Sequence, residues 1–254
     1  MGFHDHSGAR VTTLLLVRHG LTAMTGPVLA GHLPGIDLDD RGRAQAAMLA
    51  ERLRPVPLTA IVTSPLERCV QTASAVAADR GGLSPQLDDR LVEVRYGDWT
   101  GRPLKELVAE PLWKVVQHHP SAAVFPGPGG ESLAHTQVRA LAAVRDWNAR
   151  LGPDATWLAC SHGDVIKALL ADALGMHLDL FQRIVVEPCS VSVVRYTQAR
   201  PFVLRMNDTG GDIRSLLQQP PGEAPEAGVP EPDHAEAAVG GGAGVPGGQE
   251  VSPC

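Results

Sequence analysis

The run VTTLLLV at residues 11–17 is the feature that most restricts the fold, because it is a continuous and largely apolar segment. A strand of this kind is buried on both faces, so other elements must cover it from both sides. The sequence predicts further short strands at 59–63 and 156–160 and two closing strands at 191–196 and 202–205.

Helical spacing of apolar residues alternates with these strands. The predicted helices cover residues 41–53, 64–78, 132–151 and 165–174. The second of them carries a capping-box signature, with Ser64 as N-cap, Pro65 at the first helical position and Glu67 at the third. Strands that alternate with helices of this length predict an α/β fold, a three-layer α/β/α sandwich with a mostly parallel central sheet.

The two ends of the chain differ in composition from the rest. Residues 215–254 hold 7 Pro, 8 Gly and no aromatic residue, and their six acidic residues without any basic one account for the net charge of −6. Such a segment cannot bury enough apolar surface to offset its ordering entropy. We therefore predict a flexible N-terminus at 1–10, one folded domain at 11–214 and a disordered acidic tail at 215–254.

Several classes of protein are disfavoured by the same composition. The 22 basic residues are balanced by acidic ones outside the tail, so there is no basic footprint for nucleic acid. No apolar stretch approaches the roughly 20 residues that a membrane-spanning helix needs, and the N-terminus lacks the apolar core of a secretory signal. The four cysteines are widely spaced, which argues against a disulfide scaffold and a structural zinc site. We expect a cytoplasmic protein with no membrane or nucleic-acid partner.

Charged and polar residues follow three of the predicted strands. The first strand leads into Arg18 and His19, the second into Ser64 and Arg68, and the third into His162. Ligands of parallel sheets bind beyond the carboxyl ends of the strands. Two arginines and two histidines at that edge predict an anion site, and phosphate is the preferred anion because guanidinium groups and helix N-termini bind it well.

These segments carry a resemblance to a known family. The matching stretches, in chain order, are LLLVRHGLT at 14–22, LDDRGRAQA at 38–46, SPLERCVQTA at 64–73, LVEVRYGDWTG at 91–101, GGES at 129–132 and ACSHGDVI at 159–166. Together they resemble the histidine phosphatase superfamily, in its phosphoglycerate mutase-like branch with the R-H-G signature. The resemblance identifies 11–214 as a histidine phosphatase domain.

The resemblance also implies roles for single residues. His19 is expected to be the nucleophile that becomes phosphohistidine, and Glu93 the proton donor. Arg18, Arg68 and a protonated His162 are expected to hold the phosphoryl oxygens. The remaining expected substrate contacts are Thr25, which replaces the family's Asn, and Gly163. No cofactor or metal is expected, since two guanidinium groups and an imidazolium can stabilise the phosphoryl charge.

Other interpretations stay open for some of these residues. Glu67, Asp98, Glu106 and Glu131 are alternative carboxylates to Glu93. His162 and Gly163 could form a simple helix entry capped by Ser161. Among the remaining residues of interest, Cys160 and Cys189 are expected in the core, and Trp99 is expected to pack rather than to line the pocket.

The expected reaction is hydrolysis of a small phosphorylated metabolite. Leu21 and Met24 stand where mutases of the family carry Glu and Trp, and the region between Gly101 and Glu131 is short, which favours a phosphatase over a phosphoglycerate mutase. The mutase remains the first alternative and a non-catalytic phospho-ligand binder the second. A two-metal phosphoesterase is disfavoured because no G-N-H-[DE] cluster accompanies Asp98 and Asp164.

The identity of the substrate and the oligomeric state are left open by the sequence. Six basic residues lie in or near the stretch expected to roof the pocket: Arg95, Arg102, Lys105, Lys114, His118 and His119. They could recognise a second acidic group of the substrate, or they could form a solvated basic face.

Overall fold

The computed structural model describes residues 11–210 of the 254-residue chain. The predicted N-terminal segment and acidic tail therefore lie outside the described residues. The strands are β1 (Thr12–Arg18), β2 (Ala60–Thr63), β3 (Gln86–Leu87), β4 (Thr156–Ser161), β5 (Val191–Tyr196) and β6 (Pro201–Asp208). The α-helices are α1 (Asp40–Leu53), α2 (Glu67–Ala77), α3 (Leu104–Leu107), α4 (Pro111–His118), α5 (Leu133–Leu151) and α6 (Gly163–Ala173). Four short 3-10 helices complete the described chain: Asp89–Leu91, Gly97–Trp99, Pro120–Ala122 and Leu178–Arg183.

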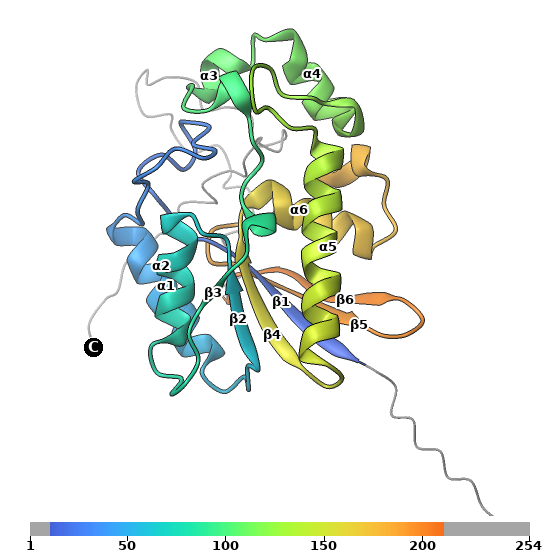
Figure 1. Cartoon of the computed structure of the whole chain (residues 1–254). Coiled ribbons are helices and arrows are strands. Elements are labelled where there is room, and N and C mark those ends of the chain that lie inside the picture. The colour runs from blue at the N-terminus through green and yellow to red at the C-terminus, as the bar shows by residue number, and fades with distance from the viewer. Residues whose placement is uncertain (1–10, 211–254) are drawn as a thin grey trace, which may run out of the picture.

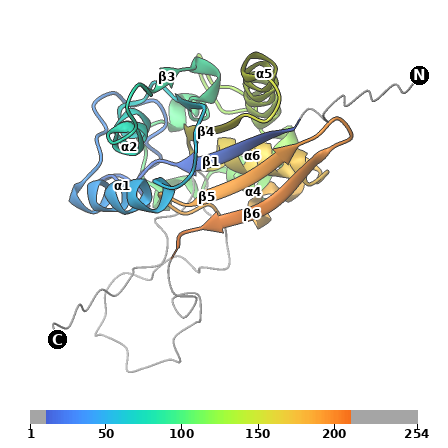
Figure 2. The ribbon, with the colours of Figure 1, turned by 90° about the horizontal axis from the view of Figure 1, so that it is seen from below.

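The central sheet has the strand order β3-β2-β4-β1-β5-β6. The first four strands are parallel, whereas β5 pairs antiparallel with both β1 and β6. Helices α1 and α2 cover one face of the sheet and α5 and α6 the other (Figures 1 and 2). This arrangement confirms the predicted three-layer α/β/α sandwich. None of the helices described between residues 11 and 210 has both the length and the apolarity to cross a membrane.

Strand β1 is covered on both sides, as its apolar run predicts. Leu14 and Leu16 belong to the core beneath α5 and α6, whereas Leu15 and Val17 face the core beneath α1 and α2. Each of these four side chains is at most 4% exposed. At about 25 cal/mol per Å² of apolar surface, burial of this kind supplies the main favourable term in folding.

The carboxyl ends of β1, β2 and β4 meet at one edge of the sheet. Arg18 pairs in register with Ser161, and Thr63 pairs with Cys160. The chain continues this alignment beyond the strands, because the His19 amide donates to the Ser161 carbonyl at 3.0 Å. The three polar junctions predicted from the sequence are therefore neighbours, and α3 and α4 lie beyond this edge at the top of Figure 1.

The predicted start of α2 is wrong. The helix begins at Glu67 with Leu66 as N-cap, and no side chain caps it. Ser64 is not the N-cap because its hydroxyl lies 2.8 Å from His162 Nε2, and Glu67 Oε1 accepts instead from the Gly35 amide. Helix α6 likewise begins two residues earlier than predicted, with His162 rather than Ser161 as N-cap.

The turn after β1 packs directly on the start of α1. A Cβ on Gly20 would lie 2.7 Å from the Gly42 carbonyl oxygen, and a Cβ on Gly42 would overlap the Leu21 backbone. The Leu21 amide also donates to Gln45 Oε1 at 3.0 Å. Both glycines and Gln45 are thus required by the close approach of two backbones.

We expect Gly42→Ala to lower the free energy of unfolding by about 1–3 kcal/mol, because overpacking against backbone cannot be relieved by a rotamer change. Urea unfolding followed by circular dichroism measures this loss. Gly81→Ala is the matched control, since a Cβ there meets nothing within 4 Å. Equal stability of the two variants would contradict the proposed contact.

Candidate active site

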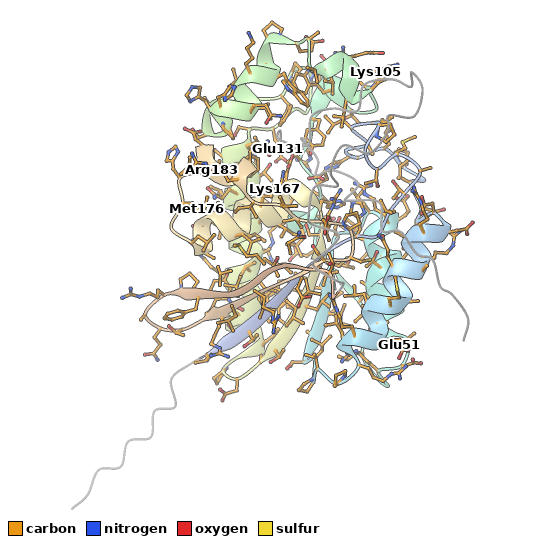
Figure 3. The ribbon with its side chains drawn as sticks, turned by 180° about the vertical axis from the view of Figure 1, so that it is seen from behind. Glu51, Lys105, Glu131, Lys167, Met176 and Arg183 are labelled. Carbon is orange, nitrogen blue, oxygen red and sulfur yellow. The ribbon has the colours of Figure 1, made fainter. Side chains whose placement is uncertain are left out.

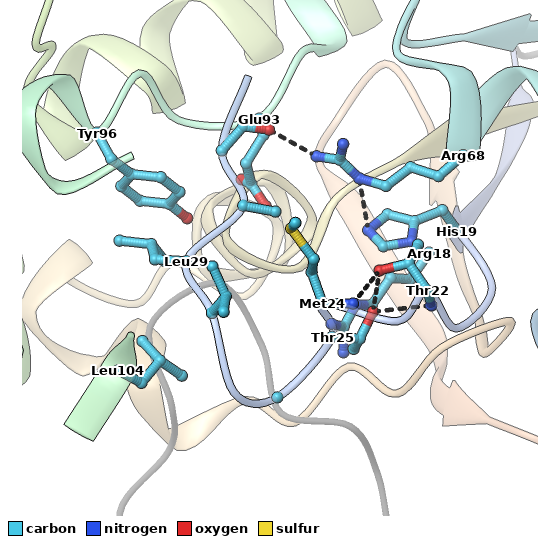
Figure 4. Close-up of a pocket in the computed structure, with 14 residues that line it drawn as sticks. Arg18, His19, Thr22, Met24, Thr25, Leu29, Arg68, Glu93, Tyr96 and Leu104 are labelled. Atoms are coloured by element: carbon cyan, nitrogen blue, oxygen red, sulfur yellow. Dashed lines mark hydrogen bonds between the residues drawn. The ribbon is translucent and has the colours of Figure 1, made fainter. Parts of the chain in front are cut away.

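A pocket that is partly open to solvent lies at the carboxyl edge of the sheet (Figure 4). Its inner end is formed by Arg18, His19, Arg68 and Glu93. These four side chains are at most 5% exposed. Buried charged groups of this kind occur where a protein binds a charged ligand or performs chemistry, because their desolvation is costly.

The imidazole of His19 is held in one tautomer. Its Nδ1 lies 2.8 Å from the Gly20 carbonyl oxygen, which can only accept, so Nδ1 carries the proton. Nε2 therefore keeps its lone pair. Burial, followed by the nearby charges of Arg68 and Arg18, lowers the pKa of His19 well below its usual value. The ring is neutral at neutral pH, with Nε2 available as a base or a nucleophile.

Arg68 links the two histidines. Its Nε donates to His19 Nε2 at 3.3 Å, and its Nη2 lies 3.1 Å from His162 Nδ1 and donates to the Gly31 carbonyl at 2.8 Å. The third nitrogen, Nη1, is buried and makes no hydrogen bond to the described residues. The guanidinium thus presents a donor where an anion approaching His19 would lie. On the same side, Arg18 donates from Nη1 to the Val186 carbonyl at 2.8 Å.

His162 lies behind Arg68 and does not line the pocket wall. Since Arg68 can only donate, His162 Nδ1 accepts and Nε2 carries the proton, which it donates to Ser64 Oγ at 2.8 Å. Burial, followed by the charge of Arg68, lowers the pKa of His162 well below its usual value. These contacts favour the neutral ring of His162, whereas the resemblance implied a protonated ring holding the phosphoryl oxygens.

Glu93 brings a carboxyl group into the same pocket. Its Oε1 accepts from the Val94 amide at 2.9 Å. Burial and the charge of Asp164 raise the pKa of Glu93 to about 7, although the amide bond and both arginines act in the opposite direction. Glu93 can therefore give or take a proton near neutral pH.

The four alternative carboxylates lie outside the pocket lining. Among them, Glu131 has a supporting role, because its Oε1 accepts from the Arg95 amide at 2.9 Å and it pairs with Arg139 at 2.6 Å. Arg139 in turn donates to the carbonyl of Glu93 at 2.9 Å. The GGES segment thus fixes the backbone that presents Glu93.

Three buried residues near Glu93 belong to the site although the sequence did not predict this: Tyr96, Asp164 and Lys167. Tyr96 lines the pocket and donates its hydroxyl to Asp164 Oδ2 at 3.0 Å, and Lys167 donates to Asp164 Oδ1 at 3.4 Å. Asp164 is fully buried and Lys167 is 2% exposed. The Asp164 carboxylate beneath the pocket is one of the causes of the raised pKa of Glu93.

Of the other residues named from the sequence, one lines the pocket and the rest are buried outside its lining. Thr25 lines the pocket, with its Oγ1 3.1 Å from the Thr22 amide, whereas Gly163 is buried at the first position of α6 and does not line it. Trp99 packs in the core, as predicted. The two cysteines predicted to be core residues, Cys160 and Cys189, are likewise buried.

The fold and the pocket define a class: an α/β protein whose buried cationic pocket lies at the carboxyl edge of a mostly parallel sheet. A comparison with protein families makes this specific, because the profile of the histidine phosphatase superfamily (branch 1) matches residues 14–209. The chain belongs to the histidine phosphatase superfamily and is an enzyme of that family.

Curated relatives include both phosphatases and a mutase. Glucosyl-3-phosphoglycerate phosphatase of Mycolicibacterium vanbaalenii is 36% identical over 178 residues, which cover 67% of this chain and 77% of that protein. Phosphoserine phosphatase 1 of Hydrogenobacter thermophilus is 31% identical, with 77% of this chain and 92% of that protein covered. A Yersinia enterocolitica protein named probable phosphoglycerate mutase GpmB is 32% identical over 73% of this chain and 86% of its own length.

A comparison with solved structures also finds a phosphatase with the same fold. The native structure of a mycobacterial glucosyl-3-phosphoglycerate phosphatase superposes with a TM-score of 0.70 at 26% identity. The match covers 78% of this chain and all of that chain. The shared fold and the phosphatases among these relatives support a phosphatase activity.

Proposed function

We propose that this protein is a metal-independent phosphomonoesterase that works through a phosphohistidine on His19. The observation that carries the proposal is the state of His19: a neutral imidazole with Nδ1 bonded to the Gly20 carbonyl and Nε2 directed at Arg68. Binding alone would need neither a free ring nitrogen nor a carboxyl group poised near pH 7. Both are needed for nucleophilic displacement on phosphorus.

In the first step, the substrate phosphoryl group lies between Arg18 and Arg68, whose charges stabilise its equatorial oxygens. The lone pair of His19 Nε2 forms the N–P bond while the P–O bond to the leaving alcohol breaks. Protonated Glu93 gives its proton to that alcohol oxygen, so an alkoxide is never released. The incoming phosphoryl oxygens take over the donors that Arg68 offers to both histidines.

In the second step, water attacks the phosphohistidine. Glu93, now ionised, takes a proton from the water, and the N–P bond breaks to return neutral His19 and inorganic phosphate. A phosphoryl dianion next to His162 favours protonation of that ring, and this would restore the imidazolium that the sequence predicted. Thr25 and the amide of Gly163 are the further proposed substrate contacts.

The experiment that tests this function is phosphate release from a panel of monoesters in the presence of EDTA. We expect release that is unaffected by the chelator. Conversion of 3-phosphoglycerate that requires added bisphosphoglycerate would instead identify the mutase reaction, and phosphate binding without any turnover would identify a non-catalytic binder.

The proton-donor role predicts a defined pH dependence. The pKa of Glu93 is about 7, and the protonated form is the acid that acts. We therefore expect kcat/KM for alkyl phosphates to fall as the pH rises through about 7. In Asp164→Asn the negative charge that raises this pKa is lost, although Arg18, Arg68 and Tyr96 still face Glu93, so the fall should begin at lower pH. The titration of the substrate is the same for the wild type and Asp164→Asn, so it cannot cause a difference between them. Identical pH profiles of kcat/KM for the two proteins would contradict the effect of Asp164 on the pKa of Glu93.

A further inference from the structure

The pocket has a second half that the mechanism does not use. Beyond the phosphoryl end, the side chains of Met24, Leu29 and Leu104 and the ring of Tyr96 line the pocket (Figure 4), and Val28 is a further apolar lining residue. Leu29 and Tyr96 belong to the hydrophobic core, and Leu104 packs against it. The part of the pocket that would receive the leaving alcohol is thus apolar and built on the core.

Cationic side chains are confined to the inner end of the pocket. Among the described lining residues, Arg18 and Arg68 are the basic ones besides His19, and the transferring phosphoryl group occupies both.

The segment that carries α3 and α4 (residues 101–119) is called the cap here. The six basic residues in or near the cap do not supply a cation for a second acidic group of the substrate. None of the six named from the sequence lines the pocket. Arg102 is engaged with Glu110 at 2.7 Å, and Lys105 lies exposed on the outer side of the cap (Figure 3). The remaining four are also exposed: Arg95, Lys114, His118 and His119. They form a solvated face, and the sequence-based alternative of a second acid-binding group is not supported.

We propose that the leaving alcohol of the substrate is uncharged and mainly apolar, so the enzyme prefers alkyl or aryl phosphate monoesters to phosphorylated carboxylic acids. This inference rests on the proposed function. An ionised carboxylate against the wall of Met24, Val28 and Leu104 would lose water without gaining a partner, and this loss is costly. The two relatives named for glucosyl-3-phosphoglycerate and phosphoserine are named for acidic substrates, so a different specificity is expected here.

The test compares kcat/KM for phenyl and hexyl phosphate with kcat/KM for 3-phosphoglycerate and O-phosphoserine. We expect the neutral esters to be preferred by roughly tenfold or more, the range that one mismatched group in a pocket produces. Leu104→Arg should shift the ratio toward 3-phosphoglycerate by a similar factor. Val108→Arg is the matched control on the same cap segment, because Val108 is 54% exposed and does not line the pocket. Equal or better turnover of the acidic esters by the wild type would overturn the proposal.

A binding measurement separates this proposal from the proposed function. Isothermal titration with phenylphosphonate and with 3-phosphonopropionate, neither of which can be hydrolysed, reports the preference without catalysis. Tighter binding of phenylphosphonate supports an apolar subsite even if no ester is turned over, in which case the hydrolase proposal alone fails. Equal or tighter binding of the carboxylate-bearing phosphonate overturns the subsite proposal, whatever the catalytic result.

Discussion

His19→Ala is expected to lower kcat for phosphate release by roughly 10⁴–10⁶-fold, the upper end being the loss seen when a covalent nucleophile is removed. The reason is that His19 is the one imidazole among the pocket-lining residues described between 11 and 210, and its Nε2 is unprotonated. Arg18 and Arg68 are cations, and Glu93 must supply a proton in the same step. The measurement is phosphate release in the presence of EDTA. The variant is assayed at a high enzyme concentration so that slow turnover is still detected.

The matched control is His118→Ala, because His118 lies exposed on α4 and does not line the pocket. We expect wild-type kinetics from this control. Since His19 is buried, the circular dichroism spectrum and phosphate binding of His19→Ala must be measured as well. A folded His19→Ala protein that keeps more than about a tenth of the activity would exclude His19 as the nucleophile, because loss of covalent catalysis cannot be so small.

Glu93→Gln is expected to have an effect that depends on the leaving group. For an alkyl phosphate, loss of the acid should lower kcat by roughly 10²–10⁴-fold, as is usual for general acid–base catalysis. For 4-nitrophenyl phosphate the phosphorylation step should be nearly unaffected, because nitrophenolate leaves without a proton. Hydrolysis of the phosphohistidine still lacks its base. Stopped-flow absorbance should therefore show a burst of about one nitrophenolate per enzyme followed by slow turnover.

Glu106→Gln serves as the control for this variant, since Glu106 is an exposed carboxylate on α3 outside the pocket lining. We expect it to hydrolyse both kinds of ester like the wild type. A Glu93→Gln enzyme that loses the same factor on alkyl and nitrophenyl esters, with no burst, would show that Glu93 acts through structure rather than through its proton.

Much of the fold could be predicted because buried strands and their polar ends leave direct signals in the sequence. The run at 11–17 and the junctions at Arg18, Arg68 and His162 placed three strand ends at one edge, and the structure brings them together. The start of α2 was mispredicted because local capping rules competed with a tertiary contact. Ser64 has the right residue type for a cap, but its hydroxyl contacts His162, which is 98 positions away in sequence.

The network beneath Glu93 was not predictable from local patterns. Asp164 and Lys167 are spaced like an exposed helical ion pair, which would add little to stability or function. One signal was available, since the sequence around Lys167 is apolar (VIKALL at 165–170), and the structure buries α6 from Gly163 to Ala171. A lone lysine in such a helix must have a buried partner. Likewise, basic residues of the cap could be counted in the sequence, but whether they face the pocket depends on packing.

The most direct test of the central claim is isolation of the phosphorylated enzyme. Wild-type protein and Glu93→Gln are mixed with a radiolabelled phosphate monoester, quenched in alkali within milliseconds to seconds and mapped by mass spectrometry of peptides. With 4-nitrophenyl phosphate as the labelled ester, we predict a phosphoryl group on His19 that is stable in alkali and labile in acid, with more of it in Glu93→Gln and none in His19→Ala. Turnover without any covalent phosphoryl group, or with the label on Ser64 or Cys69, would contradict it.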